Sequence, residues 1–532
     1  AGDPTVSGAV KAIVYTVSKD ADGNPVLTEE SFVDMGTVGT AMNDFAWDYA
    51  NNLYVVGSNK EKVVAYAMPY SGEVTTPCAE KLTIVAGWVP TTTEALNPFA
   101  YGLSSELIDG GMNLKINYSL NAPATTAQVI IMDGNTEVKA VACTELTKGS
   151  HTITIPTEGL PSNTDLTWKI VVNGTSLDKV HEYATKHKFY HPSSVDVDNN
   201  PENETFGLVL VNEAMNSVKS KTDTYLSAQF GAGIFAFDPT FKNIGKYNGG
   251  IAFTNTRADN AEATAYAPRR IRISDDGRIF VTSLNTNGDV LWEVNPSAMN
   301  TWTPIFAGLT QDANKDLVNG ATFVAGPNAG FDVRGSGDKL QLLMLSSNTQ
   351  AFGLGQRGFR VSEYDLGNNT SWNTAPSKAF PHENLPTGQC YFINPTASQV
   401  QYDKDGGVWY IQYRGTTTES EPGLVHINKD GVEDLKQLRH YTRNAGFRFT
   451  DDFSKVIIAG VTDGSNVKKA TIYAVSQDEN GAPVLTEETV IETSVLGSNL
   501  NDFAWDYAGN LYGVSNSNEK LAAWAMPYSG QV

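Results

Sequence analysis

The chain has 532 residues, of which 41% are hydrophobic and 18% are charged, a balance typical of a folded protein rather than a disordered one. Its 38 lysines and arginines are outnumbered by 59 aspartates and glutamates, which gives a net charge of −21 with no basic run. Nucleic acid and an acidic membrane surface are therefore excluded as direct partners, because both require clustered positive charge. No stretch reaches the roughly 18 apolar residues of a membrane span, and the length predicts two or three domains.

Residues 1–76 predict short antiparallel strands. Residues 10–17 and 26–34 flank the segment Asp-Ala-Asp-Gly-Asn at 20–24, where glycine and asparagine allow the positive φ of a hairpin turn. Three short apolar segments follow at intervals of about ten residues, separated by Asn/Gly turns: 45–49, 53–56 and 63–68. This spacing is typical of a β-meander.

Residues 77–190 differ in character and predict a separate β-sandwich. Its candidate strands alternate apolar and polar residues and are separated by glycine-containing turns; they are 112–119, 127–132, 138–142, 151–155 and 166–172. The segments 97–100, 116–120 and 129–138 resemble the immunoglobulin-like and fibronectin-type spacers of secreted bacterial proteins. That resemblance implies a spacer or binding module without catalytic activity.

The meander pattern returns over residues 191–532. The candidate strand cores each lie beside an Asp/Gly turn; they are 207–211, 270–274, 278–282, 340–345, 408–413, 455–460 and 511–514. The phrase Asp-x-x-Gly-x-Ile/Val/Leu-Tyr/Phe/Trp recurs among them and resembles the strand–turn–strand unit of β-propellers with NHL or lactonase-like blades. We therefore expect an all-β chain, with a six- to seven-bladed β-propeller in addition to the β-sandwich.

Residues 12–74 recur at residues 470–532 without a gap. The two copies are identical at 35 of 63 positions, and the longest identical run, at 43–50, reads Asn-Asp-Phe-Ala-Trp-Asp-Tyr-Ala. Neighbouring blades of one propeller usually share only a loose pattern, so this identity indicates duplication of a larger unit. Tandem units of about 458 residues would explain it, with the chain a part of a longer array. One closed propeller that uses both copies as blades stays open as the alternative.

Two groups of residues are candidates for ligand binding. Arg269, Arg270 and Arg272 lie along one predicted strand in a chain with few basic residues, where they can line a channel mouth for an anionic group such as a uronate. Salt bridges on the outer face of a blade are the alternative. Aromatic side chains in segments rich in Asn and Gln can stack on sugar rings, and the candidates are Trp302, Trp372, Tyr391 and Phe392.

Calcium is the one cofactor that the sequence suggests. Asp312, Asn314 and Asp316 alternate oxygen donors along a predicted loop, and calcium takes six to eight oxygen ligands. The segment lacks the glycine and the distal glutamate of an EF-hand, so a solvated acidic loop is the alternative.

No catalytic residue is predicted. The sequence contains neither an HExxH zinc motif nor a GxSxG nucleophile elbow. The GxGxxG match at 353–358 lacks the strand and helix of a dinucleotide site. Cys78, Cys143 and Cys390 show no CxxC spacing and are interpreted as free thiols, although a bridge between Cys78 and Cys143 stays open.

The composition and the order of modules are similar to those of surface proteins from Bacteroidota-type bacteria. This resemblance implies an extracellular or cell-surface repeat protein that binds, adheres or displays, with a glycan or protein ligand and contacts between tandem units. Catalysis rarely needs near-identical copies, so an enzyme is less favoured. Two alternatives stay open: a polysaccharide lyase or glycosidase with its site in the propeller channel, and a structural stalk.

Overall fold

The computed structural model divides the chain into two compact units, residues 1–91 and residues 92–532. The structure describes residues 11–34, 42–47, 53–57, 62–66, 96–162, 165–174, 180–182, 189, 191–213, 233–241, 243–247, 268–283, 291–294, 302–312, 316–326, 328–348, 358–380, 399–411, 424–436, 446–460, 468–498 and 500–526.

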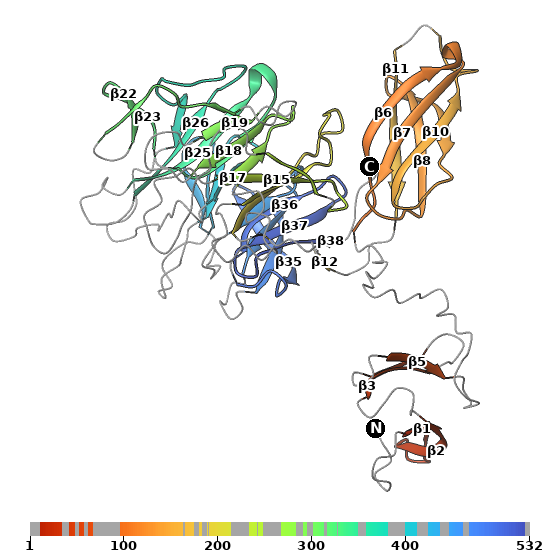
Figure 1. Cartoon of the computed structure of the whole chain (residues 1–532). Coiled ribbons are helices and arrows are strands. Elements are labelled where there is room, and N and C mark those ends of the chain that lie inside the picture. The colour runs from red at the N-terminus through yellow and green to blue at the C-terminus, as the bar shows by residue number, and fades with distance from the viewer. Residues whose placement is uncertain are drawn as a thin grey trace. The chain divides into compact units, whose positions relative to one another are not determined.

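The predicted all-β fold class is confirmed (Figure 1). Apart from strands, the described residues form only two short 3-10 turns, η2 (Asp109–Gly111) and η3 (Gly337–Lys339). Among these residues no helix has the length and apolarity that a bilayer span requires.

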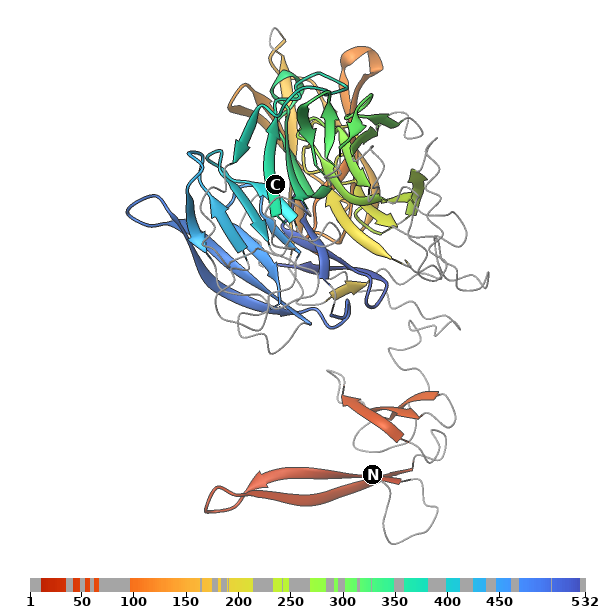
Figure 2. The same cartoon turned by 90° about the vertical axis from the view of Figure 1, so that its left-hand side faces the viewer.

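Residues 1–91 contain the predicted hairpin and meander. The strands are β1 (Lys11–Lys19), β2 (Pro25–Asp34), β3 (Met42–Trp47), β4 (Leu53–Gly57) and β5 (Lys62–Tyr66). β1 and β2 form the long hairpin drawn in red in Figure 2, and β3, β4 and β5 form one antiparallel sheet. In the hairpin turn, the Asp20 carboxylate accepts the backbone N–H groups of Asp22 and Asn24, both at 2.9 Å, while Gly23 takes a φ of 84° that a side chain would disfavour.

A β-sandwich opens the second unit. Its strands are β6 (Ala100–Ile108), β7 (Asn113–Leu120), β8 (Thr126–Asp133), β9 (Thr136–Ala142), β10 (Gly149–Pro156) and β11 (Leu166–Asn173). They form two three-stranded sheets, β10-β7-β6 and β11-β8-β9. Alternate residues of β7 point inward, as a sheet with one buried face requires, and Ile116 and Tyr118 meet Val129 and Ile131 of β8 in the core.

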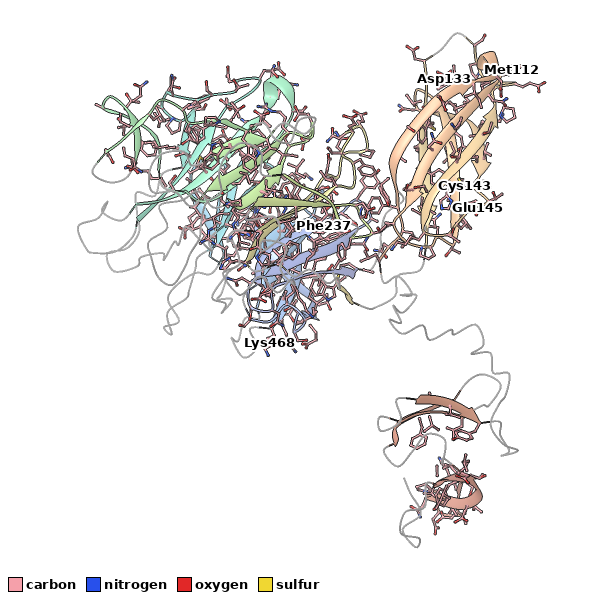
Figure 3. All side chains as sticks on the ribbon, viewed as in Figure 1. Met112, Asp133, Cys143, Glu145, Phe237 and Lys468 are labelled. Carbon is pink, nitrogen blue, oxygen red and sulfur yellow. The ribbon has the colours of Figure 1, made fainter. Side chains whose placement is uncertain are left out.

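Cys143 lies in this sandwich core as a free, buried thiol. Figure 3 shows it near Glu145, towards the opposite end of the sandwich from Met112 and Asp133. Cys78 and Cys390 lie outside the described residues.

The described residues then form six four-stranded antiparallel sheets, which we number as blades one to six in the order of their inner strands. Blade one has β13 (Pro192–Val197), β14 (Val209–Glu213), β15 (Gly233–Phe237) and β16 (Asn243–Tyr247). Blade two has β17 (Pro268–Ile273), β18 (Ile279–Ser283), β19 (Leu291–Val294) and β20 (Trp302–Pro304). Blade three has β24 (Asn328–Arg334), β25 (Gln341–Asn348), β26 (Gly358–Tyr364) and β27 (Lys378–Phe380).

The remaining blades continue the order. Blade four has β28 (Gln399–Tyr402), β29 (Val408–Ile411), β30 (Leu424–Ile427) and β31 (Glu433–Lys436). Blade five has β32 (Phe447–Phe449), β33 (Lys455–Ala459), β34 (Lys469–Gln477) and β35 (Pro483–Glu492). Blade six has β36 (Leu500–Trp505), β37 (Asn510–Ser515), β38 (Lys520–Ala525) and, as its outer strand, β12 (Val180–Glu182). A small sheet of β21 (Thr310–Gln311), β22 (Leu317–Asn319) and β23 (Thr322–Ala325) lies between blades two and three in sequence.

The blades form a ring that strand pairing closes. β12, which precedes blade one in sequence, pairs with β38 in the register Val180↔Trp524 and Glu182↔Ala522, and Figure 1 shows these two strands side by side. The inner strands β13 and β36 are also in contact. A closed ring of four-stranded blades is a β-propeller. The count of six to seven blades stays a prediction.

The repeat in sequence is also a repeat in structure. The pair β1–β2 matches β34–β35 in register, and both pairs carry a bulge at the same place, after Val14 and after Ile472. The sheet β3–β4–β5 likewise matches β36–β37–β38, again with a shared bulge. Residues 11–66 therefore reproduce the outer strands of blade five and three strands of blade six, although they lie in the separate unit 1–91.

A polar joint connects the sandwich to blade six. The backbone N–H of Asn97 donates to Oδ1 of Asn510 at 2.6 Å, and Nδ2 of Asn510 donates to the Asn97 carbonyl at 3.0 Å. Asp506 accepts from the side chain of Asn510, and burial raises the pKa of this carboxyl to about 7. Beside these groups, Phe99 packs edge-on against Phe206 with 5.8 Å between ring centroids.

Candidate ligand pocket on the propeller axis

The inner strands bring charged side chains together on the axis of the propeller. Five inner strands contribute them, namely β13 with Asp196, β17 with Arg270 and Arg272, β24 with Asp332, β32 with Arg448 and β36 with Asp502. All but Arg448 are buried. Buried charges are stable only when they are paired and hydrogen-bonded, and these form one continuous network.

Asp502 is the most enclosed member of the network. Its side chain is fully buried, and Nη1 of Arg272 lies 3.0 Å from Oδ2. Nε2 of Gln399 donates to Oδ1 at 2.6 Å, and the Ser194 hydroxyl donates to Oδ2. Burial alone would raise the pKa of Asp502, but Arg272 and Arg270 outweigh it and lower the pKa below its usual value. The carboxyl is therefore ionised.

Asp196 and Asp332 share the guanidinium of Arg448. Nη2 of Arg448 lies 2.9 Å from Asp196, and Nη1 lies 3.6 Å from Asp332. Each carboxylate also accepts a backbone N–H from the next blade, that of Ile273 at 2.8 Å and that of Tyr402 at 2.9 Å. Burial raises the pKa of both carboxyls, although the arginines oppose the shift. These bonds link neighbouring inner strands, so the network also holds the ring together.

A pocket of about 630 Å³ opens above this network, and we call it the axial pocket. It lies at the ends of the inner strands, where the first turn of each blade forms the wall. Its polar and aromatic lining includes seven aspartates, three basic residues and four aromatic rings: Asp196, Asp198, Asp275, Asp332, Asp403, Asp451, Asp452, Arg334, Lys404, Arg448, Tyr402, Phe449, Phe453 and Trp505.

Three polar atoms of residues that line the axial pocket have no hydrogen-bond partner within the described structure, namely Oδ1 of Asn199, Nη1 of Arg448 and the Tyr402 hydroxyl. Asn199 is held through Nδ2, which donates to the Trp505 carbonyl at 2.9 Å and to Asp451 at 3.0 Å. Nη1 of Arg448 makes no hydrogen bond but lies 3.6 Å from the Asp332 carboxylate, in the ion pair described above. The lining therefore holds a buried acceptor on Asn199 and a buried donor on Arg448 whose hydrogen-bonding capacity is not used within the described residues.

A second pocket of about 500 Å³ adjoins the first, between blades five and six. The two pockets share Asp451, Asp452 and Trp505 in their linings. The second one adds the apolar surfaces of Tyr507 and Met526.

None of the three predicted arginines lines either pocket. Arg270 and Arg272 are each 2% exposed and lie in the ion-pair network, with Asp502 as a common partner. Arg269 is also buried, and its carbonyl accepts the Ser193 hydroxyl at 3.0 Å. Their role in binding an anionic ligand stays a prediction.

The predicted aromatic and metal residues also lie outside the two pockets. Trp372 packs edge-on against Tyr364 with 5.7 Å between centroids, and its Nε1 donates to the Thr374 carbonyl. Trp302, on β20, packs against the apolar core between blades one and two. Tyr391 and Phe392 lie outside the described residues. Sugar stacking by these rings stays a prediction.

Asp312 and Asp316 are close together. Oδ1 of Asp312 accepts the backbone N–H of Asp316 at 3.0 Å, and the Asp316 carboxylate pairs with Arg360 at 3.0 Å. Asn314 lies outside the described residues. In the part of the chain that the structure describes, no group of three or more His, Cys, Asp or Glu residues could hold a metal ion. Calcium binding stays a prediction.

Behind the pocket wall, a buried histidine bridges two carboxylates. Nε2 of His426 lies 3.2 Å from the carboxylate of Asp403, which lines the axial pocket, and Nδ1 contacts Asp434. The Trp409 ring lies against the imidazole, with 4.5 Å between centroids. Burial alone would lower the pKa of His426, but the two carboxylates outweigh it and raise the pKa above its usual value.

We expect this triad to give the protein a pH-dependent stability. A raised pKa means that the stabilisation is fully present below pH 6.5 and is lost as the pH rises through the higher pKa of the folded state. The free energy of unfolding of the wild type should therefore fall more between about pH 6 and about pH 9 than that of His426→Gln. His151→Gln, at a site on the sandwich, is the control and should retain the wild-type slope. Equal slopes for the wild type and His426→Gln would contradict the assignment.

No protein-family model and no curated protein matches the chain. Several solved structures are similar in fold. A Bacteroides thetaiotaomicron protein of unknown function is 10% identical, with 80% of this chain and 98% of that chain covered and a TM-score of 0.37. The extracellular domain of a proposed hybrid two-component system from the same organism is 10% identical, with 96% and 60% covered and a TM-score of 0.32. An ancestral GH74 enzyme is 10% identical, with 98% and 82% covered and a TM-score of 0.33. Likenesses this distant carry no argument about activity, so the propeller assignment rests on the sheets themselves.

Proposed function

We propose that the chain is a non-catalytic extracellular or cell-surface binding protein of bacterial type, and that its axial pocket binds a sugar residue of a glycan. The observation that supports this proposal is that two buried polar atoms of residues lining one pocket, Oδ1 of Asn199 and Nη1 of Arg448, make no hydrogen bond within the described residues. A sugar hydroxyl both donates and accepts, so neighbouring hydroxyls can satisfy the acceptor and the donor together.

The rest of the lining supports the same ligand class. Binding sites combine a few fixed polar groups with apolar surface that removes the ligand from water. Here the carboxylates of the wall accept from hydroxyls, and Trp505, in the wall shared with the second pocket, adds aromatic surface. The shared wall suits a ligand of more than one sugar unit.

Binding without catalysis is supported by the partners of the two carboxylates on the pocket floor. Asp196 and Asp332 each accept a backbone N–H and pair with Arg448. A general acid or base needs a free position towards its substrate, and these groups are held by the ring instead.

A glycan array tests the proposal. Labelled full-length chain is applied to an array of bacterial, plant and host oligosaccharides, and the strongest signal is followed by calorimetry with that oligosaccharide. We expect Asn199→Ala to weaken binding by about tenfold or more, since it removes a buried hydrogen bond to the ligand. Asn480→Ala, in an exposed turn of blade five, is the matched control and should bind like the wild type. Failure of the wild type to bind any glycan, or equal affinity for both variants, would overturn the proposal.

A carbohydrate-active enzyme is the second candidate, and one observation favours it. Burial raises the pKa of Asp196 and of Asp332 on the pocket floor, and raised carboxyl pKa values occur in the catalytic acids of glycosidases. Incubation of a bound oligosaccharide with the chain, followed by mass spectrometry, distinguishes the two functions. Shortened or unsaturated products would establish catalysis, and an unchanged oligosaccharide supports binding alone.

A further inference from the structure

Residues 11–66 repeat the part of the ring that blade six and the outer half of blade five occupy. One face of blade six packs on blade one. The residues of that face are Ala504, Tyr512, Val514, Leu521 and Ala523. Their counterparts in the N-terminal copy are Ala46, Tyr54, Val56, Val63 and Ala65, so four of the five are identical and the fifth is also aliphatic. The copy thus keeps the residue types that fit blade one. The sequence of its own unit, residues 1–91, contains no copy of blade one.

The opposite face, which packs on blade five, has changed more. Gly513 of blade six has become Val55, and Val55 lies in the core of the N-terminal unit. A Cβ at Gly513 would lie 2.9 Å from Cδ1 of Leu496, and the counterpart of Leu496 is the shorter Val38. Val55 packs there with Leu53 and Tyr66, so the copy is a packed element in its own right.

The residues that join blade six to the axis are also kept. Nδ2 of Asn501 donates to the Pro192 carbonyl at 2.6 Å, and Asp502 pairs with Arg272. Their counterparts are Asn43 and Asp44. The partners come from β13 and β17, which the repeat does not include, so the kept pair matches a propeller ring rather than the N-terminal unit.

The residues of blade six that bind Asn97, at the start of the sandwich, are also conserved in the N-terminal copy. In blade six, Asn97 is held by Asn510, by the Ala508 carbonyl and by the Met526 carbonyl. The counterparts are Asn52, Ala50 and Met68, all three identical.

Apolar side chains of this copy are exposed where those of blade six are buried. Phe45 is 39% exposed, whereas its counterpart Phe503 is fully buried. Ala46 is exposed as well, and its counterpart Ala504 is 1% exposed. Packing of the copy into a ring would bury these two side chains, as it buries their counterparts in blade six.

We propose that residues 11–66 of one chain take the place of residues 469–524 in the propeller ring of a second copy of this chain. In that ring, β3 lies against β13 of the second copy, Asp44 pairs with its Arg272, and β12 of the second copy adds the outer strand to β5. The exchange replaces the contacts with blade one and with the axis by matching ones, as in domain swapping. The oligomer is favoured at high concentration and forms slowly, because the resident strands must first leave. This association does not depend on the axial pocket.

Photo-crosslinking in the full chain tests the exchange. Tyr512 packs against Phe241 of blade one with 5.7 Å between ring centroids, so its counterpart Tyr54 is replaced by benzoylphenylalanine. Isotopically light and heavy chains are mixed, refolded together at high concentration and illuminated. We expect crosslinks between a light and a heavy chain that join position 54 to residues 233–241. The control label at Val26, whose counterpart Val484 is 40% exposed, should give none to that segment. Crosslinks confined to single chains, or no crosslink from position 54, would overturn the proposal.

Light scattering of refolded full-length variants gives a second test that needs no label. Asp44→Ala removes the carboxylate that the exchanged blade presents to Arg272, so we expect the oligomer fraction to fall several-fold below that of the wild type. Asp22→Ala, in the exposed hairpin turn, is the control and should leave the fraction unchanged. A monomeric wild type at every concentration, or an oligomer that persists in Asp44→Ala, would overturn the proposal.

Discussion

Replacing Arg272 with alanine is expected to lower the free energy of unfolding of the 92–532 unit by about 3–5 kcal/mol. Arg272 is 2% exposed, and its guanidinium lies 3.0 Å from Asp502 and 3.7 Å from Asp332. Its removal would leave these buried carboxylates without a counter-charge. Burial disfavours the charged form of Arg272, but the surrounding carboxylates outweigh it and raise the pKa above its usual value. Urea unfolding followed by tryptophan fluorescence measures the loss.

Arg334→Ala is the matched control for this measurement. Arg334 carries the same charge on a neighbouring inner strand, but its side chain is 34% exposed and its closest carboxylate contact, to Glu363, is 3.7 Å. We expect a loss of about 1 kcal/mol or less. In the double variant Arg272→Ala/Asp502→Ala, the total loss of unfolding free energy should be smaller than the sum of the losses in the two single variants, because the two residues are partners. A stable Arg272→Ala variant that has lost ligand binding would instead support the anion-binding role predicted for this arginine.

Asn510→Ala is expected to loosen the sandwich from the propeller and to lower the free energy of unfolding by about 2–4 kcal/mol. The side chain is fully buried and bonds both backbone groups of Asn97 as well as Asp506. Its removal leaves a buried N–H, a buried carbonyl and a carboxylate oxygen each short of a partner. Hydrogen exchange measured by mass spectrometry should show loss of protection at residues 96–100 and 506–510.

Asn480→Ala is the control for the joint, because Asn480 lies in an exposed hairpin turn of the same propeller. It should leave both the stability and the exchange pattern unchanged. Wild-type protection of residues 96–100 in Asn510→Ala would show that the apolar contact between Phe99 and Phe206 holds the joint without the amide.

Local chemistry made much of the fold predictable. The turn at 20–24 combines a carboxylate that accepts backbone N–H groups with a glycine of positive φ, and both features are visible in the sequence. Strand alternation likewise marked the sandwich, since one face of each sheet is buried. The ring closure was not predictable, because β12 has only three residues and pairs with a strand at the far end of the ring.

The axial pocket depends on contacts that sequence spacing does not reveal. Arg270 and Arg272 stood out as basic residues on a strand, but their partner Asp502 lies 230 positions or more away. The signal that sequence reasoning missed is a charged residue within an apolar inner strand that ends at an Asp/Gly turn. Asp196, Asp332 and Arg448 all occupy such positions. An alignment of the inner strands of successive blades would have identified these three residues as occupying equivalent positions.

Closure by β12 and β38 has a consequence for how the protein is made. The ring cannot close until β38 has left the ribosome, and at about 5–20 residues per second the roughly 340 residues between the two strands take about 20–70 s to synthesise. Throughout that interval β12 and the inner edge of β13 lack the partners that they have in the finished ring. Strand edges in this state pair readily with other chains. A new propeller is therefore open to pairing with other chains for as long as this part of its synthesis lasts.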